Sequence, residues 1–193
     1  MSETTTPTTA DALGLIAAEN ARVVDSLRAT SASALVDAAD LLTAAPRVFV
    51  LGAGRSGLAL KMTAMRLMHL GLTVHVVGEV TSPAIASGDV LLVASGSGTT
   101  GAIVRAAETA HGVGASILAL TTAPDSPLGR LAAVTVLIPA AAKRDHAGQV
   151  SAQYSGGLFE QAVLLVGDAL FHTLWKASGA TAEQLWPRHA NLE

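Results

Sequence analysis

Short runs of consecutive apolar residues alternate along this chain with longer segments in which apolar residues recur every three or four positions. The short runs are typical of buried strands and the longer segments of amphipathic helices. Five strands are predicted, at residues 47–51, 73–77, 89–94, 116–121 and 134–138. Because these runs do not alternate with polar residues, helices should cover both faces of the sheet. The pattern predicts an α/β fold, with a five-stranded parallel sheet in a three-layer α/β/α arrangement of the flavodoxin or Rossmann type.

Helical periodicity and capping residues place the helices of this fold. They are predicted at residues 11–29, 33–45, 56–70, 100–111, 158–178 and 181–186. The first begins behind Thr8 and Thr9 as caps, and its apolar stripe consists of Leu13, Ile16, Val23, Val24 and Leu27. Residues 124–127 are predicted to form a turn. The polar segment 139–157 is longer than ordinary connections, which favours a functional role. Residues 1–9 are predicted to be a disordered N-terminus, and residues 10–193 a single domain.

Composition narrows the classes of function. Half of the residues are apolar and 14% are charged, so other subunits are expected to cover part of the surface. The net charge is −3 and no basic run occurs, which argues against nucleic acid as a ligand. The absence of cysteine excludes thiol catalysis and disulfides and fits a cytoplasmic location. Glu160 and Asp168 interrupt the longest apolar stretch, so no membrane span is expected there.

Two glycine-rich loops carry the clearest chemical signal. Gly52–Gly57 follows the first predicted strand, and Ser95–Thr100 follows the third. In a strand–loop–helix unit, backbone N–H groups and a helix N-terminus point at one place and favour an anion. The hydroxyl groups of the second loop add further donors. The two loops together predict a small phosphorylated ligand.

The first loop also permits another interpretation. Gly52, Gly54 and Gly57 satisfy the dinucleotide pattern G-x-G-x-x-G, and Glu79 lies twenty-two residues after Gly57. Against a dinucleotide site, there is no room for a separate substrate domain, and Ser95–Thr100 has no role in that pattern. A purely structural turn also stays open for the first loop, as does a helix-capping turn for the second.

Several motifs resemble those of the 6-phospho-3-hexuloisomerases, within the sugar isomerase (SIS) domain family. They are residues 52–57 (Gly-Ala-Gly-Arg-Ser-Gly), 65–71 (Met-Arg-Leu-Met-His-Leu-Gly), 76–79 (Val-Val-Gly-Glu), 95–98 (Ser-Gly-Ser-Gly), 158–161 (Leu-Phe-Glu-Gln) and 189–193 (His-Ala-Asn-Leu-Glu). The resemblance covers nearly the whole chain from about residue 10. It implies interconversion of D-arabino-3-hexulose 6-phosphate and D-fructose 6-phosphate, in the ribulose monophosphate route of formaldehyde assimilation. It also implies a homotetramer, or dimer of dimers, without a metal or organic cofactor.

The chain departs from the family pattern at two places. Thr99 stands where the family usually carries Glu, and residues 154–157 (Tyr-Ser-Gly-Gly) replace the usual Pro-Met-Gly-Ser. The first change lies beside the expected phosphate, and the second directly precedes Glu160. Two other functions stay open: a non-catalytic phosphosugar sensor, because SIS domains also serve in regulators, and a dinucleotide-binding protein.

The resemblance assigns roles to individual residues. Glu160 is expected to be the catalytic base and His69 to assist catalysis, although each is also a natural helix-end residue. Substrate and phosphate binding are assigned to Gly54, Arg55, Ser56, Ser95, Gly96, Ser97 and Thr100. Arg55 is also open to interpretation as a solvated loop cation. Glu79 and His189 are candidates for contacts with the sugar or a neighbouring subunit. The histidines lack paired metal-ligand spacing, so no metal site is predicted.

Overall fold

Five parallel strands form a sheet in the order β2-β1-β3-β4-β5. The computed structural model describes residues 6–140 and 151–192. The strands are β1 (Val48–Gly52), β2 (Val74–Val76), β3 (Val90–Ala94), β4 (Ser116–Thr121) and β5 (Val134–Leu137). Strand β1 lies between β2 and β3, and Gly52 pairs with Ala94 at the carboxyl ends of β1 and β3. The chain therefore reverses its direction of travel across the sheet between β1 and β3, where ligands of such folds commonly bind.

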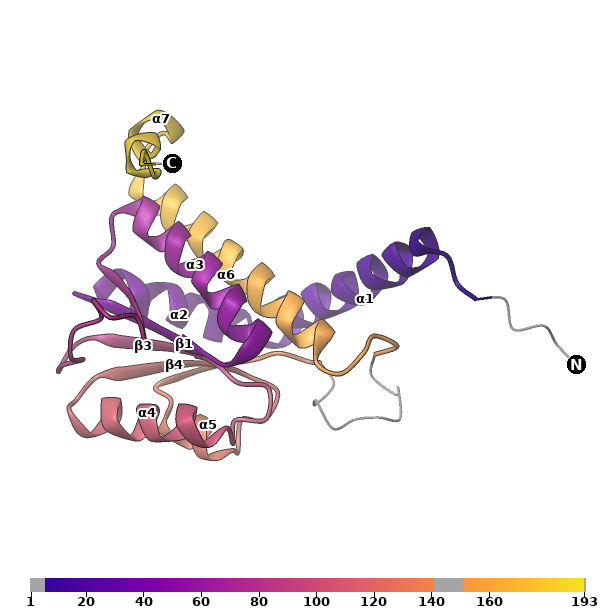
Figure 1. The fold of residues 1–193 in the computed structure, drawn as a ribbon, viewed down its shortest axis with the longest axis horizontal. Coiled ribbons are helices and arrows are strands. Elements are labelled where there is room, and N and C mark those ends of the chain that lie inside the picture. Colours follow the sequence, from indigo (N-terminus) through magenta and orange to yellow (C-terminus); the bar gives the residue numbers. More distant parts are fainter. Residues whose placement is uncertain (1–5, 141–150, 193) are drawn as a thin grey trace, which may run out of the picture.

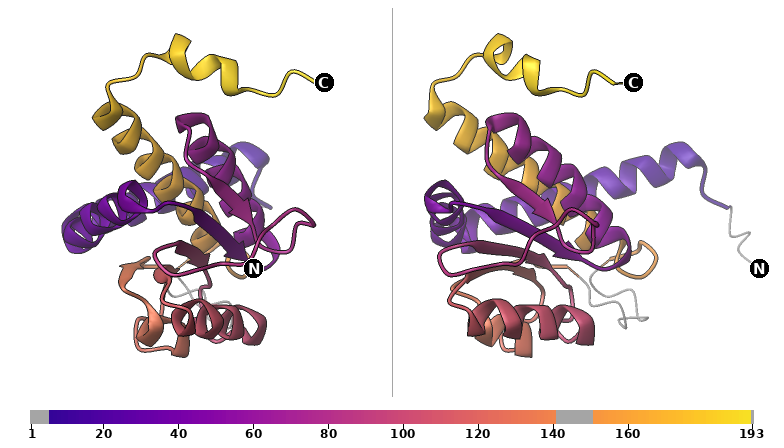
Figure 2. Two further views of the ribbon diagram at one scale, coloured as in Figure 1. Left: turned by 90° about the vertical axis from the view of Figure 1, so that its left-hand side faces the viewer. Right: turned by 60° about the vertical axis from the view of Figure 1, so that its left-hand side comes forward.

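Helices cover both faces of this sheet (Figures 1 and 2). They are α1 (Thr9–Thr30), α2 (Ala32–Ala44), α3 (Gly54–Leu70), α4 (Gly101–Gly112), α5 (Pro127–Leu131), α6 (Gly157–Ser178) and α7 (Ala182–Leu185), followed by the 3-10 helix Trp186–Arg188. Helix α5 lies where only a turn was predicted. Its start is fixed by Ser126, whose hydroxyl oxygen accepts a hydrogen bond from the Gly129 N–H at 3.2 Å. A serine cap and a proline in the first turn suffice to form this short helix.

The apolar side chains of each strand divide between two cores. In β3, Leu92 is buried on the side of α3 and α6, and Leu91 and Val93 are buried on the side of α4. Successive side chains of a strand point to opposite faces, so a sheet covered on both sides needs a continuous apolar run. The predicted three-layer α/β/α fold with a five-stranded parallel sheet is confirmed.

Helices α3 and α6 lie side by side along much of their length (Figure 1). Their first turns meet through Arg55 and Glu160. At the other end, the Arg188 guanidinium donates to the carbonyl oxygen of His69 at 2.9 Å. An α-helix rises 1.5 Å per residue, so Arg55 and His69 lie about 20 Å apart along α3. The helix pair therefore has two distinct polar ends.

Helix α1 extends past the sheet with its N-terminal half (Figure 1). Its predicted apolar stripe is wrong at two positions, because Leu13 and Val24 are 64% and 36% exposed. The buried residues of α1 are Glu19, Val23 and Leu27. None of the helices in the described ranges is both long enough and apolar enough to cross a membrane.

Candidate active site

The two glycine-rich loops meet at the carboxyl edge of the sheet. Between them lies a small cavity of about 40 Å³. Its lining includes Ser56 from the first loop and Ser95, Gly96, Ser97 and Thr100 from the second. Five of the seven residues predicted to bind phosphate thus surround one space. The Ser56 and Ser95 side chains are buried, so their hydroxyl groups are shielded from bulk water.

The second loop is held in place from outside the cavity. The Gly96 carbonyl oxygen accepts hydrogen bonds from Thr121 Oγ1 at 3.1 Å and from Thr122 Oγ1 at 2.8 Å. The Gly98 carbonyl oxygen accepts one from the Leu128 N–H at 3.1 Å. Gly98 has φ of +61°, a left-handed conformation that favours glycine. These bonds hold the loop through its carbonyl oxygens, and within the loop Ser97 Oγ accepts hydrogen bonds from the Thr99 N–H at 3.3 Å and from Thr99 Oγ1 at 3.0 Å.

Helix α4 begins at this cavity. Its N-cap residue is Thr100, whose side chain does not bond to the helix backbone. Thr100 Oγ1 instead lies 3.3 Å from Ser95 Oγ. The first N–H groups of a helix have no partner within the helix and carry partial positive charge. Loop hydroxyls and the α4 N-terminus therefore face the same small space, an arrangement suited to a phosphate group.

The spacing of the first loop has a packing explanation. A side-chain carbon added at Gly57 would overlap the carbonyl oxygen of Gly52, so strand β1 and helix α3 approach each other through these two glycines. Such close helix–strand packing is one role of glycine in a dinucleotide pattern, and it does not itself require a dinucleotide. Gly54, the second glycine of the pattern, begins α3 with φ of +57° and does not line the cavity.

Arg55 and Glu160 form an ion pair beside the loops. Arg55 Nε donates to Glu160 Oε2 at 2.5 Å. The arginine side chain is 69% exposed, whereas that of Glu160 is 6% exposed. Both residues line a larger cavity of about 690 Å³, bounded by α1 and by the residues that precede α6. The ion pair therefore lies in the wall of this cavity.

Helix α6 places Glu160 near the second glycine-rich loop. Glu160 lies in the first turn, as predicted, and its N–H donates to the Gly156 carbonyl oxygen at 3.1 Å. The neighbouring Phe159 is buried, and a side-chain carbon added at Gly96 would lie 3.6 Å from its ring. Residues more than sixty positions apart in the sequence thus pack together. The carboxylate, the guanidinium and the loop hydroxyls lie in one region.

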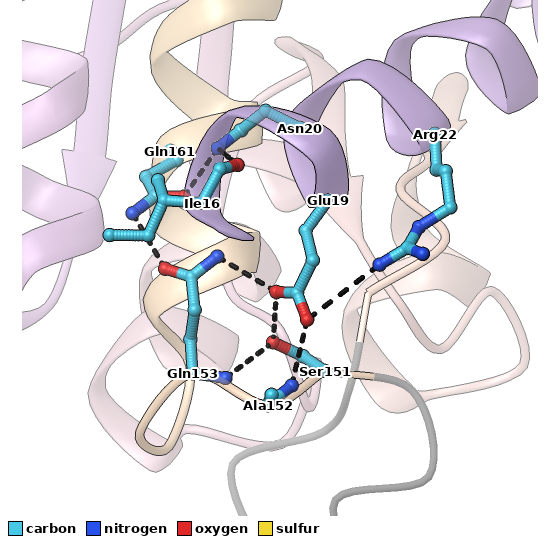
Figure 3. A network of polar contacts seen from close by, with 8 residues as sticks. All are labelled: Ile16, Glu19, Asn20, Arg22, Ser151, Ala152, Gln153 and Gln161. Carbon is cyan, nitrogen blue, oxygen red and sulfur yellow. Dashed lines mark hydrogen bonds and ion pairs between the residues drawn. The ribbon is translucent and has the colours of Figure 1, made fainter. Parts of the chain in front are cut away.

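A polar network that the sequence analysis missed lies behind this region (Figure 3). Glu19 of α1 is buried and accepts hydrogen bonds from Ser151, Ala152 and Gln153. A signal was present in the sequence, because Glu19 follows Ile16 by three positions and precedes Val23 by four. A carboxylate within an apolar helical stripe marks a buried polar contact.

His69 and His189 lie at the opposite end of α3. Their rings stack with centroids 4.0 Å apart, and the ring centroids of Trp186 and His189 are 4.6 Å apart. Burial, with the charges of His189 and Arg66, lowers the pKa of His69 and favours its neutral imidazole. Within the described residues, its buried Nδ1 atom has no hydrogen-bond partner. The structure therefore brings the two predicted histidines together but places them far from Glu160 of the same chain.

Glu79 occupies a third location, in the turn after β2. Its carboxylate accepts a hydrogen bond from Lys61 of α3 at 2.7 Å, and both side chains are about half exposed. This bond and the lysine charge lower the pKa of Glu79 below 4.5. Glu79 lines neither of the two cavities described above, and its contact with sugar or subunit stays a prediction. In the described part of the chain, no three His, Asp or Glu residues cluster as a metal site.

The arrangement of loops and helices matches a known family. Residues 41–165 fit the model of the SIS domain. The chain belongs to the SIS domain family. This confirms the family that the sequence motifs predicted, and the matched residues of the SIS domain include both glycine-rich loops and Glu160.

Relatives and solved structures agree with this assignment. The chain is 62% identical over 147 residues to a 3-hexulose-6-phosphate isomerase of Mycobacterium gastri, covering 76% of this chain and 74% of the relative. It is 39% identical over 156 residues to the Bacillus subtilis enzyme of the same name, covering 80% and 84%. A solved Methanococcus jannaschii protein, inferred to have this function, superposes with a TM-score of 0.80 at 24% identity, over 95% of this SIS-domain chain and 99% of that protein. At that identity the likeness shows the fold.

Proposed function

We propose that this protein interconverts D-arabino-3-hexulose 6-phosphate and D-fructose 6-phosphate. The observation that carries the proposal is 62% identity, over about three quarters of each chain, to a protein named 3-hexulose-6-phosphate isomerase. The cluster of loop hydroxyls beside a buried carboxylate supports it, because an isomerase of this type needs a phosphate site and a base. The proposed setting is the ribulose monophosphate route in the cytoplasm, which a cysteine-free chain suits.

The proposed phosphate site is the cavity between the two loops. Ser56, Ser95, Ser97 and Thr100 donate hydroxyl hydrogens to the phosphate oxygens, and Gly96 lets the backbone approach closely. The N-terminus of α4 adds the positive end of its dipole. Binding at the phosphate places the carbon chain of the sugar toward Arg55 and Glu160.

The proposed base is Glu160. Its carboxylate removes the proton from C2 of the 3-ketose, which gives a 2,3-enediolate, and returns that proton to C3. The proton on the C2 hydroxyl passes to the oxygen at C3, so the carbonyl group moves to C2 and no atom is gained or lost. Arg55 lies at the same carboxylate, and its guanidinium can swing to the enediolate oxygen because its side chain is largely exposed.

The assembly that we propose is a homotetramer, built as a dimer of dimers. Leu58, Met62 and Met65 form an exposed apolar stripe on α3, with 62%, 51% and 52% of each residue exposed. A second copy packed on this stripe would bury it. His69 would then act on the substrate of a neighbouring copy, since about 20 Å separates it from Arg55 along its own helix.

Proton exchange with solvent tests the proposed function. Purified protein is incubated with fructose 6-phosphate in deuterated water, and the product mixture is followed by NMR. We expect the 3-hexulose phosphate to appear and deuterium to enter at C3 of fructose 6-phosphate. Tight phosphosugar binding without interconversion or exchange would identify the protein as a sensor instead and would reject the enzyme.

A further inference from the structure

A single carboxylate on α1 holds the chain segment that leads into α6. Glu19 is 3% exposed and accepts hydrogen bonds from three consecutive residues. Ser151 Oγ donates at 2.6 Å, the Ala152 N–H at 2.8 Å and Gln153 Nε2 at 2.9 Å. All three bonds are drawn in Figure 3, where Glu19 reaches down from α1 onto the segment. The carboxylate thus fixes both the backbone and two side chains of this segment.

The same network continues to the residue next to Glu160. Gln161 Nε2 donates to Gln153 Oε1 at 2.8 Å, and Asn20 Nδ2 donates to Gln161 Oε1 at 2.6 Å. Asn20 follows Glu19 on α1, so the contacts join α1, the segment and the first turn of α6 in a closed ring (Figure 3). The ring fixes the direction in which the segment enters α6 at Gly157.

The position requires an acceptor with negative charge. Burial alone raises the pKa of Glu19, but the hydrogen bonds from Ser151, Ala152 and Gln153 outweigh it and hold that pKa below 4.5. Arg22 is 3.8 Å away and 72% exposed, so it contributes little. If position 19 served only helix packing, an apolar side chain would suit it better, because it would continue the stripe of Ile16 and Val23. The carboxylate therefore has a role beyond joining α1 to the core.

The held segment forms one wall of the cavity at the proposed catalytic pair. Gln153 and Tyr154 line the same 690 Å³ cavity as Arg55 and Glu160. We propose that Glu19 is a positioning residue that acts through this segment to set the direction of the Glu160 carboxylate. The inference rests on the proposed function, because it assumes that Glu160 is the base. A misplaced catalytic group slows the chemical step without a matching loss of substrate binding.

The near-isosteric variant Glu19→Gln tests this role. The variant replaces one carboxylate oxygen of Glu19 by an NH2 group, which is a hydrogen-bond donor. This donor faces the donors of residues 151–153, so the three hydrogen bonds cannot all form. We expect kcat to fall roughly 10- to 100-fold while KM changes less than about threefold. Asp25→Asn is the matched control, because Asp25 lies on the same helix but is 77% exposed, and its kcat should be unchanged. A kcat for Glu19→Gln within twofold of the parent would overturn the proposal.

Two further variants separate positioning from a general loss of folding. Ser151→Ala removes one donor to Glu19 and leaves the other two, so we expect a smaller fall in kcat, roughly three- to tenfold, with a melting temperature lowered by only a few degrees. The double variant E19Q/Q153E exchanges the carboxylate and the amide and restores their mutual hydrogen bond. It should regain at least part of the kcat that Glu19→Gln loses. A double variant no faster than Glu19→Gln would argue against the proposal.

Hydrogen exchange gives a readout that does not depend on activity. In Glu19→Gln, amide exchange should accelerate in residues 151–161 and stay unchanged in residues 95–100. If the parent protein has no isomerase activity, the proposed function fails. The hydrogen-bond network is tested separately: it is rejected if amide exchange in residues 151–161 is the same in Glu19→Gln and in the parent. If the parent is active and Glu19→Gln keeps its kcat, only the positioning role fails.

Discussion

Arg55 Nε donates a hydrogen bond to Glu160 Oε2 at 2.5 Å, across 105 positions of the sequence. The bond joins the first turn of α3 to the first turn of α6 and thereby connects the first glycine-rich loop to the proposed base. Arg55 was predicted to bind sugar or phosphate, and its pairing with Glu160 gives it an additional partner. Because 69% of the arginine side chain is exposed, its guanidinium is free to take part in the proposed reaction.

Replacing the proposed base should abolish turnover without abolishing binding. For Glu160→Gln we expect kcat to fall by about 10²–10⁴, the usual contribution of a general base, because the amide cannot accept the C2 proton. The affinity for fructose 6-phosphate, measured by calorimetry, should stay within a few-fold of the parent. Asp168→Asn, an exposed residue of the same helix, serves as the control. Full activity of Glu160→Gln would remove Glu160 from the mechanism.

The proposed phosphate site predicts that a substitution in the second loop weakens the binding of fructose 6-phosphate. Ser97→Ala removes one hydroxyl donor from the cavity and should weaken fructose 6-phosphate binding by about 1–2 kcal/mol, roughly 5- to 30-fold in Kd. The loop itself should keep its shape, because its carbonyl oxygens are held by Thr121, Thr122 and Leu128. Thr109→Ala, at an exposed hydroxyl of α4, should bind normally. Equal affinities for the two variants would exclude Ser97 as a phosphate ligand.

Mixing two inactive variants tests whether neighbouring copies share a site. His69→Gln and Glu160→Gln should each be inactive alone, whereas hybrids contain some sites in which both residues are intact. If each site takes Glu160 from one copy and His69 from its neighbour, random mixing of equal amounts of the two variants leaves about a quarter of the sites with both residues intact. We would measure activity after the variants are co-refolded, with light scattering to report the oligomeric state. No recovery from mixed oligomers would show that His69 does not serve a neighbour's Glu160.

The buried ion pair at the other edge of the sheet predicts a dependence of stability on pH. Asp89 accepts two hydrogen bonds from Arg47, at 2.9 and 2.5 Å, and its side chain is 2% exposed. The Arg47 contact lowers the pKa of Asp89 below 3.8, although burial opposes the shift. Its contribution to folding is therefore complete above pH 3.8 and is lost as the pH falls through the lower folded-state pKa.

Asp89→Asn should lower the free energy of unfolding by about 3 kcal/mol at pH 7, because it leaves Arg47 without its buried partner. Urea unfolding at several pH values measures this difference. The gap between parent and variant should narrow once the pH falls below 3.8. A gap that stays constant down to pH 2 would mean that the charge of Asp89 does not contribute. Asp37→Asn, at an exposed position, is the control.

The sequence predicted the layers and strands well because their signals are local. Each strand is a continuous apolar run, and the two sides of such a run enter different cores, as Leu91 and Leu92 do. The strand predicted at residues 116–121 has the same bounds as β4. Helix α5 was missed because a serine cap and five residues give too weak a periodic signal.

The sequence also placed the two loops and Glu160 at the ends of predicted elements, and these positions hold. What it could not supply was the distance between elements. Leu13 was misjudged because the N-terminal half of α1 extends beyond the sheet, where periodicity no longer reports burial. Glu19 was overlooked for a related reason: its partners, residues 151–153, are more than 130 positions away.

Local chemistry and periodicity thus determined the α/β class and the two glycine-rich loops, and the resemblance of the motifs indicated the family. Only the tertiary structure decided which groups meet: Arg55 with Glu160, Glu19 with the segment before α6, and His69 with His189 at the far end of α3. Secondary structure follows from contacts within a few residues, whereas a site is assembled from contacts across the whole chain. Those contacts depend on how helices pack across the sheet, which no spacing in the sequence encodes.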